Sequence, residues 1–125
     1  MTLGDYIKSA SAKQFDSGAH ACSTFCADWR VARGHADPMA DIRGLYHDEA
    51  GAEGVIYDGG GLLRLWTERM PEPDKNPIAG AIAVVKLGRQ ELMALYSGER
   101  WIFLMDSGIR AVNLPISKIL RVWNG

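Results

Sequence analysis

The apolar pattern of this chain changes from a helical to an extended period at one proline-rich segment. Before residue 70 the apolar side chains recur at three- and four-residue intervals, as in Leu3, Tyr6, Ile7 and Ala10, which is typical of an amphipathic helix. Residues 71–79 hold three of the five prolines, and short apolar runs separated by turn residues follow them. Such runs are typical of strands. Helices followed by strands predict an α+β fold.

We therefore expect one domain over residues 1–125, with a helical half at 1–70, a loop at 71–79 and an antiparallel β-meander at 80–125. Thr2 and Asp5 resemble a capping box, and Gly34 is a typical helix stop. Asp37 and Pro38 are typical of another helix start. The expected helices are 3–13, 22–33, a short one at 38–45 and 62–69, with a further helical turn or two within 48–58. The expected strands are 81–85, 92–96, 101–105, 109–114 and 119–123.

Composition excludes several classes of protein. The net charge of the 125 residues is -1 and the basic residues are scattered, so we expect no nucleic-acid partner. No apolar stretch is long enough to span a bilayer, and the first dozen residues lack the apolar centre of a signal peptide. Cys22 and Cys26 do not form a disulfide framework. With His20 they are too few for a zinc site, and we expect no metal and no cofactor.

The strongest chemical signal is Cys22, which follows the turn at Gly18 and begins the second expected helix. A cysteine at a helix N-terminus is a common arrangement for an activated thiolate. Such a nucleophile needs a general base, and no histidine follows His47. His20 is the nearest substitute base in the sequence. The competing interpretation is a small buried residue, since free cysteine is among the most buried types, and Cys26 is interpreted as core.

A nucleophile-bearing helix followed by an antiparallel sheet resembles the papain-like cysteine hydrolases. The order and spacing of residues over nearly the whole chain resemble a phage-tail branch of the NlpC-like cell-wall peptidases. The matching residues are Phe15, Gly18, Cys22, Phe25, Ala27, Asp28, Trp29, Gly34, Asp37, Pro38, Arg43, Gly44, Tyr46, Gly51, Ala52, Gly60, Gly61, Gly80, Gly108 and Trp123. The resemblance implies a papain-like fold, with the thiol of Cys22 at the nucleophile position and a base at the start of the second strand.

Three positions depart from the family pattern. Ala21 and Ala81 stand where the family has aspartates, and Leu92 stands where the family has the base histidine. A leucine cannot accept a proton from a thiol. Because loss of a base costs on the order of 10⁴ in rate when it acts as part of a unit, the resemblance implies a degenerate hydrolase.

The run from Trp101 through Phe103 to Met105 is apolar at every position, whereas a strand exposed on one face should alternate. Either both faces are buried by the chain itself, or a partner protein covers one of them. Under the second alternative, Trp66 and Trp123 are further candidate interface residues, because tryptophan is common in interface hot spots.

Three functions remain open from the sequence. The first, which the missing base favours, is a structural component of a bacteriophage tail tip or baseplate. It would be made in the host cytoplasm, carried in the virion and bound to other tail proteins. The second is an active cysteine peptidase or amidase that cuts peptidoglycan peptides during genome entry, with Cys22 as nucleophile and His20 as base. The third is a tail assembly factor that does not remain in the particle.

Overall fold

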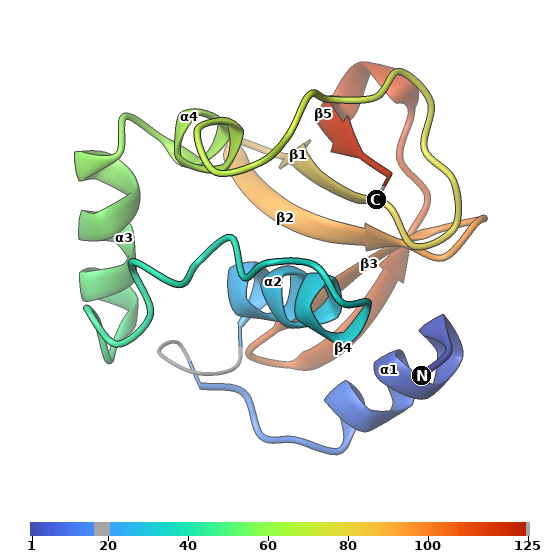
Figure 1. Cartoon of the computed structure of the whole chain (residues 1–125), viewed down its shortest axis with the longest axis horizontal. Helices are drawn as coiled ribbons and strands as arrows, with labels where there is room; N and C mark the ends of the chain where they lie inside the picture. Colours follow the sequence, from blue (N-terminus) through green and yellow to red (C-terminus); the bar gives the residue numbers. More distant parts are fainter. Residues whose placement is uncertain (17–20, 125) are drawn as a thin grey trace.

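The computed structural model describes residues 1–16 and 21–124, and in this part of the chain helices precede a five-stranded antiparallel sheet (Figure 1). The helices are α1 (Leu3–Ser11), α2 (Cys22–Ala32), α3 (Glu49–Asp58) and α4 (Leu62–Thr67). The strands are β1 (Ile82–Leu87), β2 (Gln90–Tyr96), β3 (Trp101–Met105), β4 (Gly108–Val112) and β5 (Ile119–Trp123), with a 3₁₀ turn, η1 (Ile116–Lys118), before β5. The α+β architecture expected from the sequence is confirmed.

The strand order is β4-β3-β2-β1-β5. The first four strands form the expected meander, but the expectation is wrong for the last strand, which pairs with β1 on the opposite side from β2. Pro115 interrupts the extended chain after β4, and η1 turns it back towards β1. The sheet therefore places the two ends of the strand region, β1 and β5, side by side.

Pairing between β2 and β3 is short. The paired positions are Leu95 with Ile102 and Tyr96 with Trp101, beside the turn that joins the two strands. By contrast, β1 and β2 pair over six positions, and β3 and β4 over five. The sheet therefore opens between the first half of β2 and the second half of β3.

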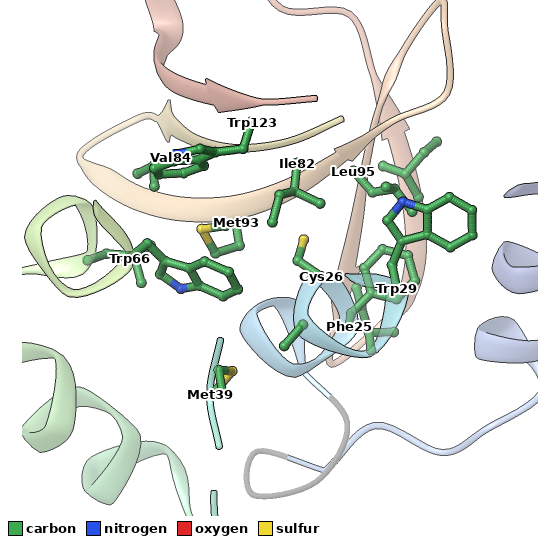
Figure 2. Packing of buried hydrophobic residues seen from close by; sticks show 14 of the residues in the cluster. Phe25, Cys26, Trp29, Met39, Trp66, Ile82, Val84, Met93, Leu95 and Trp123 are labelled. Carbon is green, nitrogen blue, oxygen red and sulfur yellow. The ribbon is translucent and has the colours of Figure 1, made fainter. Parts of the chain in front are cut away.

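Both faces of the sheet are buried. On one face Ile82, Val84, Met93 and Leu95 pack against α2 and α4 (Figure 2). The other face forms a second cluster, in which Leu114 and Ile119 from the segment around η1 pack against the strands. The second cluster's buried residues are Ala81, Ala83, Val85, Ala94, Trp101, Phe103 and Val122.

The candidate interface residues lie in these clusters. Trp66, Trp101, Phe103 and Trp123 are at most 3% exposed, and Met105 is half-buried. The chain itself therefore buries both faces of the 101–105 strand, which is the first of the two alternatives. None of the four fully buried side chains is available to a partner in this conformation.

The helical half differs from expectation in two places. Residues 38–45 form a series of turns, not a helix, and Gly44 among them adopts a positive φ of 82°, which is outside the α-helical region. Asp37 still caps the Met39 amide, as at a helix start. Conversely, 49–58 is a complete helix, begun by the Asp48 carboxylate, which accepts from the Gly51 amide at 2.7 Å. Within the described residues, no helix has the length and apolar character to cross a membrane.

Candidate functional site

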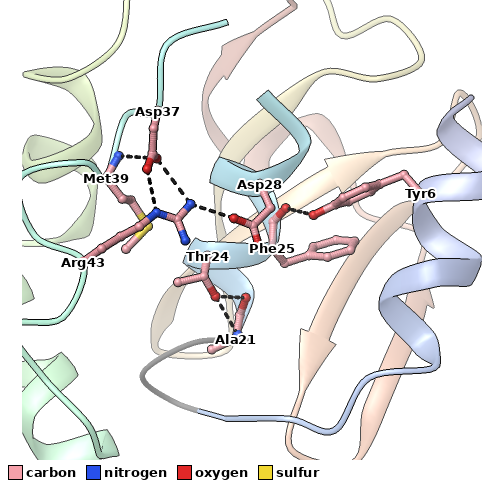
Figure 3. Close-up of polar contacts among 8 residues, drawn as sticks. All are labelled: Tyr6, Ala21, Thr24, Phe25, Asp28, Asp37, Met39 and Arg43. Carbon is pink, nitrogen blue, oxygen red and sulfur yellow. Dashed lines mark hydrogen bonds and ion pairs between the residues drawn. The ribbon is translucent and has the colours of Figure 1, made fainter. Parts of the chain in front are cut away.

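Cys22 is the first residue of α2, as expected. Ala21 is the N-cap and has no side-chain acceptor for the first helical amides. Thr24 compensates, because its hydroxyl accepts from the Ala21 amide at 2.7 Å and donates to the Ala21 carbonyl at 3.1 Å (Figure 3). The helix therefore starts at Cys22 without a carboxylate beside the thiol.

An ion-pair network holds α2 against the turns that follow it. Arg43 donates to Asp37 at 2.6 Å and to Asp28, on α2, at 2.7 Å (Figure 3). Asp37 also accepts from the Met39 amide at 2.9 Å. The three charged side chains are about one quarter to one third exposed. Asp28 of α2 is thereby bonded to the turns that follow the helix.

Two further hydrogen bonds fix α2 to other elements. The Trp29 indole donates to the Gly80 carbonyl, just before β1, at 2.8 Å. The Tyr6 hydroxyl of α1 donates to the Phe25 carbonyl (Figure 3). Both contacts are buried, so α2, and with it Cys22, has a defined position relative to the sheet.

Cys22 lines a cleft of about 710 Å³ at the place where β2 and β3 separate. The start of α2 forms one wall, α3 forms a second, and the β2 and β3 strands form the third. Leu92 lines the same cleft and also packs against the second cluster. The lining residues are Phe15, Ala21, Cys22, Glu49, Ala52, Glu53, Ile56, Gly61, Leu62, Lys86, Arg89, Gln90, Glu91, Leu92, Phe103, Leu104, Met105 and Asp106.

The thiol of Cys22 is in an apolar environment. Burial raises its pKa, and hydrogen bonds with the backbone of Met93 and with Ser23 only partly oppose this. Burial also raises the pKa of Cys26, well above its usual range, with Cys22 adding to the effect. An unperturbed cysteine, with a pKa of about 8.5, is only about 3% thiolate at pH 7. The Cys22 thiol is therefore overwhelmingly neutral at that pH.

Charged side chains lie at the rim of the cleft. Glu49 and Glu53 come from α3, whereas Lys86 and Arg89 come from the hairpin between β1 and β2. Glu91, at the start of β2, also lines the cleft and accepts weakly from the Leu63 amide, at 3.4 Å. Nothing in the sequence pattern indicates these residues, because only the packing of α3 opposite the hairpin brings them to one cleft.

The histidines do not supply a base among the described residues. His35 follows the C-terminal end of α2, and an 11-residue helix spans about 16 Å, so it lies far from Cys22. His47 is exposed and does not line the cleft. His20, the candidate substitute base, falls outside the described residues. Cys26 is fully buried, as its core interpretation predicts.

The cleft has a cysteine at the nucleophile position, but the described residues around it do not favour ionisation of its thiol. Among the described residues, no imidazole or carboxylate acts on the Cys22 thiol, whose polar contacts come from Met93 and Ser23. Leu92, one residue before Met93 on β2, supplies only apolar surface. The same part of the chain contains no group of three His, Cys, Asp or Glu side chains able to hold a metal ion.

Residues 1–124 match the model of a family described as a domain of unknown function, DUF6950, and the chain belongs to this family. No curated protein and no solved structure matches the chain.

Proposed function

We propose that this protein is a catalytically degenerate NlpC-like domain, with a papain-like fold, that serves as a structural component of a bacteriophage tail tip. The observation that carries the loss of catalysis is the pairing of a neutral Cys22 thiol with Leu92 in one cleft. A cysteine hydrolase requires an activated thiolate and a base within hydrogen-bond reach. Here burial opposes ionisation of the Cys22 thiol. The neighbouring strand, β2, contributes Leu92 and Met93, neither of which can act as a base.

The positions of the residues that line the cleft support the NlpC-like part of the proposal. The family pattern implies a nucleophile at the start of a helix and a base at the start of the neighbouring strand. Cys22 is the first residue of α2, and its thiol bonds with the backbone of Met93 near the start of β2. The position of the base implied by the resemblance, Leu92, is the adjacent residue. Two positions that are 70 residues apart in the sequence thus line one cleft.

The tail-tip role rests on the resemblance to the phage-tail branch and is tested in particles. Quantitative mass spectrometry of purified tailed particles from a phage encoding this chain should find a few copies per particle. Presence in the lysate with absence from particles would contradict a tail-tip component and favour the assembly factor or a free hydrolase. In the same phage, Cys22→Ala should leave plating efficiency nearly unchanged. A large loss with normal particle assembly would indicate catalysis.

The degenerate site is tested by restoring the base. Leu92→His should lower the pKa of the Cys22 thiol, because a neighbouring imidazolium stabilises a thiolate. A fall of one pKa unit makes the thiolate fraction at pH 7 about tenfold larger. The rate of alkylation by iodoacetamide should rise by about the same factor. Mass spectrometry of the modified peptide identifies Cys22 as the reacting residue.

Two controls make this experiment specific. Leu92→Gln introduces a polar side chain of similar size that cannot become a cation, and it should leave the alkylation rate nearly unchanged. Cys22→Ala in the Leu92→His background should abolish the added reactivity, since Cys26 is fully buried. If Leu92→His folds and Cys22 reacts no faster than in the Gln variant, the NlpC-like placement of residue 92 is wrong.

A further inference from the structure

Two nitrogens of the Arg30 guanidinium are buried and have no hydrogen-bond partner in the described part of the chain. Within the described residues, the buried side-chain nitrogen and oxygen atoms that lack a hydrogen bond are Nε and Nη1 of this one residue. The residue as a whole is 7% exposed. Buried polar groups in native proteins are nearly always paired, so an exception of this kind calls for a ligand, an ion or a water.

The neighbourhood of Arg30 adds positive charge. Arg33, the C-cap residue of α2, follows Arg30 by three residues, and its guanidinium lies 5.4 Å from the centre of the Trp29 ring. His35 follows the helix, and its amide donates to the Arg30 carbonyl at 3.0 Å. Arg30 lowers the pKa of the His35 imidazole, with burial and Arg33 adding to the effect. Burial, and then Arg33, lower the pKa of Arg30 itself.

The helix dipole accounts for only part of this cluster. Cations are favourable near the C-terminus of a helix, which explains basic residues in the last turn of α2. It does not explain why one of them is enclosed without an acceptor. Elsewhere in the chain, Arg43, Arg64 and Arg69 each form an ion pair with a carboxylate, so the fold provides acceptors for other arginines.

We propose that the C-terminal end of α2 is an oxyanion site, in which Arg30 and Arg33, with His35 beside them, bind either a carboxylate or a tetrahedral oxyanion such as sulfate. Guanidinium groups pair with both kinds of oxyanion through charge-assisted hydrogen bonds. Nη2 of Arg30 is not among the buried unpaired atoms, and in the proposed site it is the edge of the guanidinium that the ligand reaches first. The anion comes either from an acidic segment of a partner protein or from a free inorganic ion. This site is independent of the cleft and of the function proposed for it.

The imidazole of His35 reports on the site. Sulfate is a suitable probe because its charge does not change between pH 5 and 8. In an NMR titration, sulfate should raise the pKa of His35, because a bound anion offsets the two guanidinium charges. Sodium chloride at equal ionic strength is the reference, and His35→Gln assigns the signal among the three histidines.

Variants that remove one positive charge show which side chains cause the rise of the His35 pKa in sulfate. In Arg30→Met the His35 pKa should begin higher and respond to sulfate with at least about tenfold weaker affinity, as expected for loss of a charge-assisted hydrogen bond. Arg33→Gln removes the exposed charge of the pair and provides a second test if the first variant does not fold. Lys118→Gln, on η1, is the matched control and should keep the response of the unaltered protein.

An acidic hexapeptide of aspartate and glutamate distinguishes the two sources. Peptide affinity at least tenfold above that of sulfate supports a partner's acidic segment, whereas the reverse order supports a free inorganic ion. If neither probe raises the His35 pKa beyond the effect of chloride, or if Arg30→Met responds as the unaltered protein does, the oxyanion site is refuted.

Discussion

Replacing Arg30 by methionine should make the isolated protein more stable. The substitution keeps an unbranched apolar stem of similar length and removes a guanidinium whose Nε and Nη1 have no acceptor among residues 1–16 and 21–124. Replacing buried charges by apolar residues of similar size is often neutral or stabilising. Because this charge has no partner in the described structure, its removal loses no ion pair.

The magnitude follows from the two unpaired donors. A buried donor without a partner costs about 1–3 kcal/mol. Nη2 is not among the buried unpaired atoms, so two donors contribute, each taken at the lower end of the range. We therefore expect the free energy of unfolding to increase by about 1–3 kcal/mol, which corresponds to a rise in Tm of several degrees for a domain of this size.

Urea unfolding followed by tryptophan fluorescence measures this change. The buffer should contain chloride and no sulfate or phosphate, so that the oxyanion site stays empty, and the m-value should not change. Arg33→Met is the control, because Arg33 is exposed, and its effect should stay within about 0.5 kcal/mol. If Arg30→Met lowers the free energy of unfolding by more than that, Arg30 has a stabilising partner within the chain, and both this prediction and the oxyanion site fail.

Three further substitutions test the fold. Trp29→Phe removes the buried hydrogen bond to the Gly80 carbonyl, so urea unfolding should show a loss of about 1–3 kcal/mol, and unchanged stability would contradict that bond. Hydrogen bonds from Arg69 lower the pKa of Asp41, so the stability that this pair adds is present above the ordinary aspartate pKa and is lost as the pH falls through the lower folded-state value. Thermal melts between pH 6 and 2.5 should therefore converge for Asp41→Asn and the unaltered protein towards acid, and parallel curves would argue against it. Phe103→Asp places a charge at a fully buried position and should abolish cooperative unfolding measured by circular dichroism, whereas a folded variant would refute the two-sided burial of β3.

Local signals account for the parts of the fold that the sequence predicts correctly. The Thr2 hydroxyl accepts from the Asp5 amide at 3.1 Å, as the capping pattern predicts. Gly34 follows α2 with a positive φ of 87°, as a helix stop requires. The short apolar runs and the turn residues between them depend equally on near neighbours, so the sequence predicts the strand positions to within a few residues.

The errors come from contacts between distant residues. The segment after Asp37 has the residues of a helix start, but Arg43 turns back to the Asp37 and Asp28 carboxylates, and turns replace the helix. In α3 the opposite occurs: a Cβ at Gly51 would come within 2.9 Å of the Tyr46 Cβ, so glycine, a poor helix former, is required by packing. Tertiary contact overrides local propensity in both places.

The candidate site, like the fold, has residues that local sequence signals predict and residues that only tertiary contacts bring together. Cys22 at the start of α2 was predicted, because the turn and the apolar stripe are local. The rim charges were not predicted, since α3 and the β1–β2 hairpin meet only in the folded chain. The unpaired Arg30 was also missed. In the sequence it is an ordinary basic residue near a helix end, and only its burial distinguishes it.

Leucine at position 92 favours stability over reactivity at this end of the sheet. Leu92 packs against the second cluster, and the neutral Cys22 thiol that lines the same cleft needs few polar partners. A histidine there would have to be hydrated or paired, at a cost of about 1–3 kcal/mol, so Leu92→His should lower the free energy of unfolding as it raises the reactivity of Cys22. The two measurements belong together. Loss of stability with a gain in alkylation rate indicates a hydrolase-type site in which a residue that stabilises the core has replaced the catalytic base. The same loss without that gain makes Leu92 a core residue only, and the NlpC-like proposal would lose the observation that carries it.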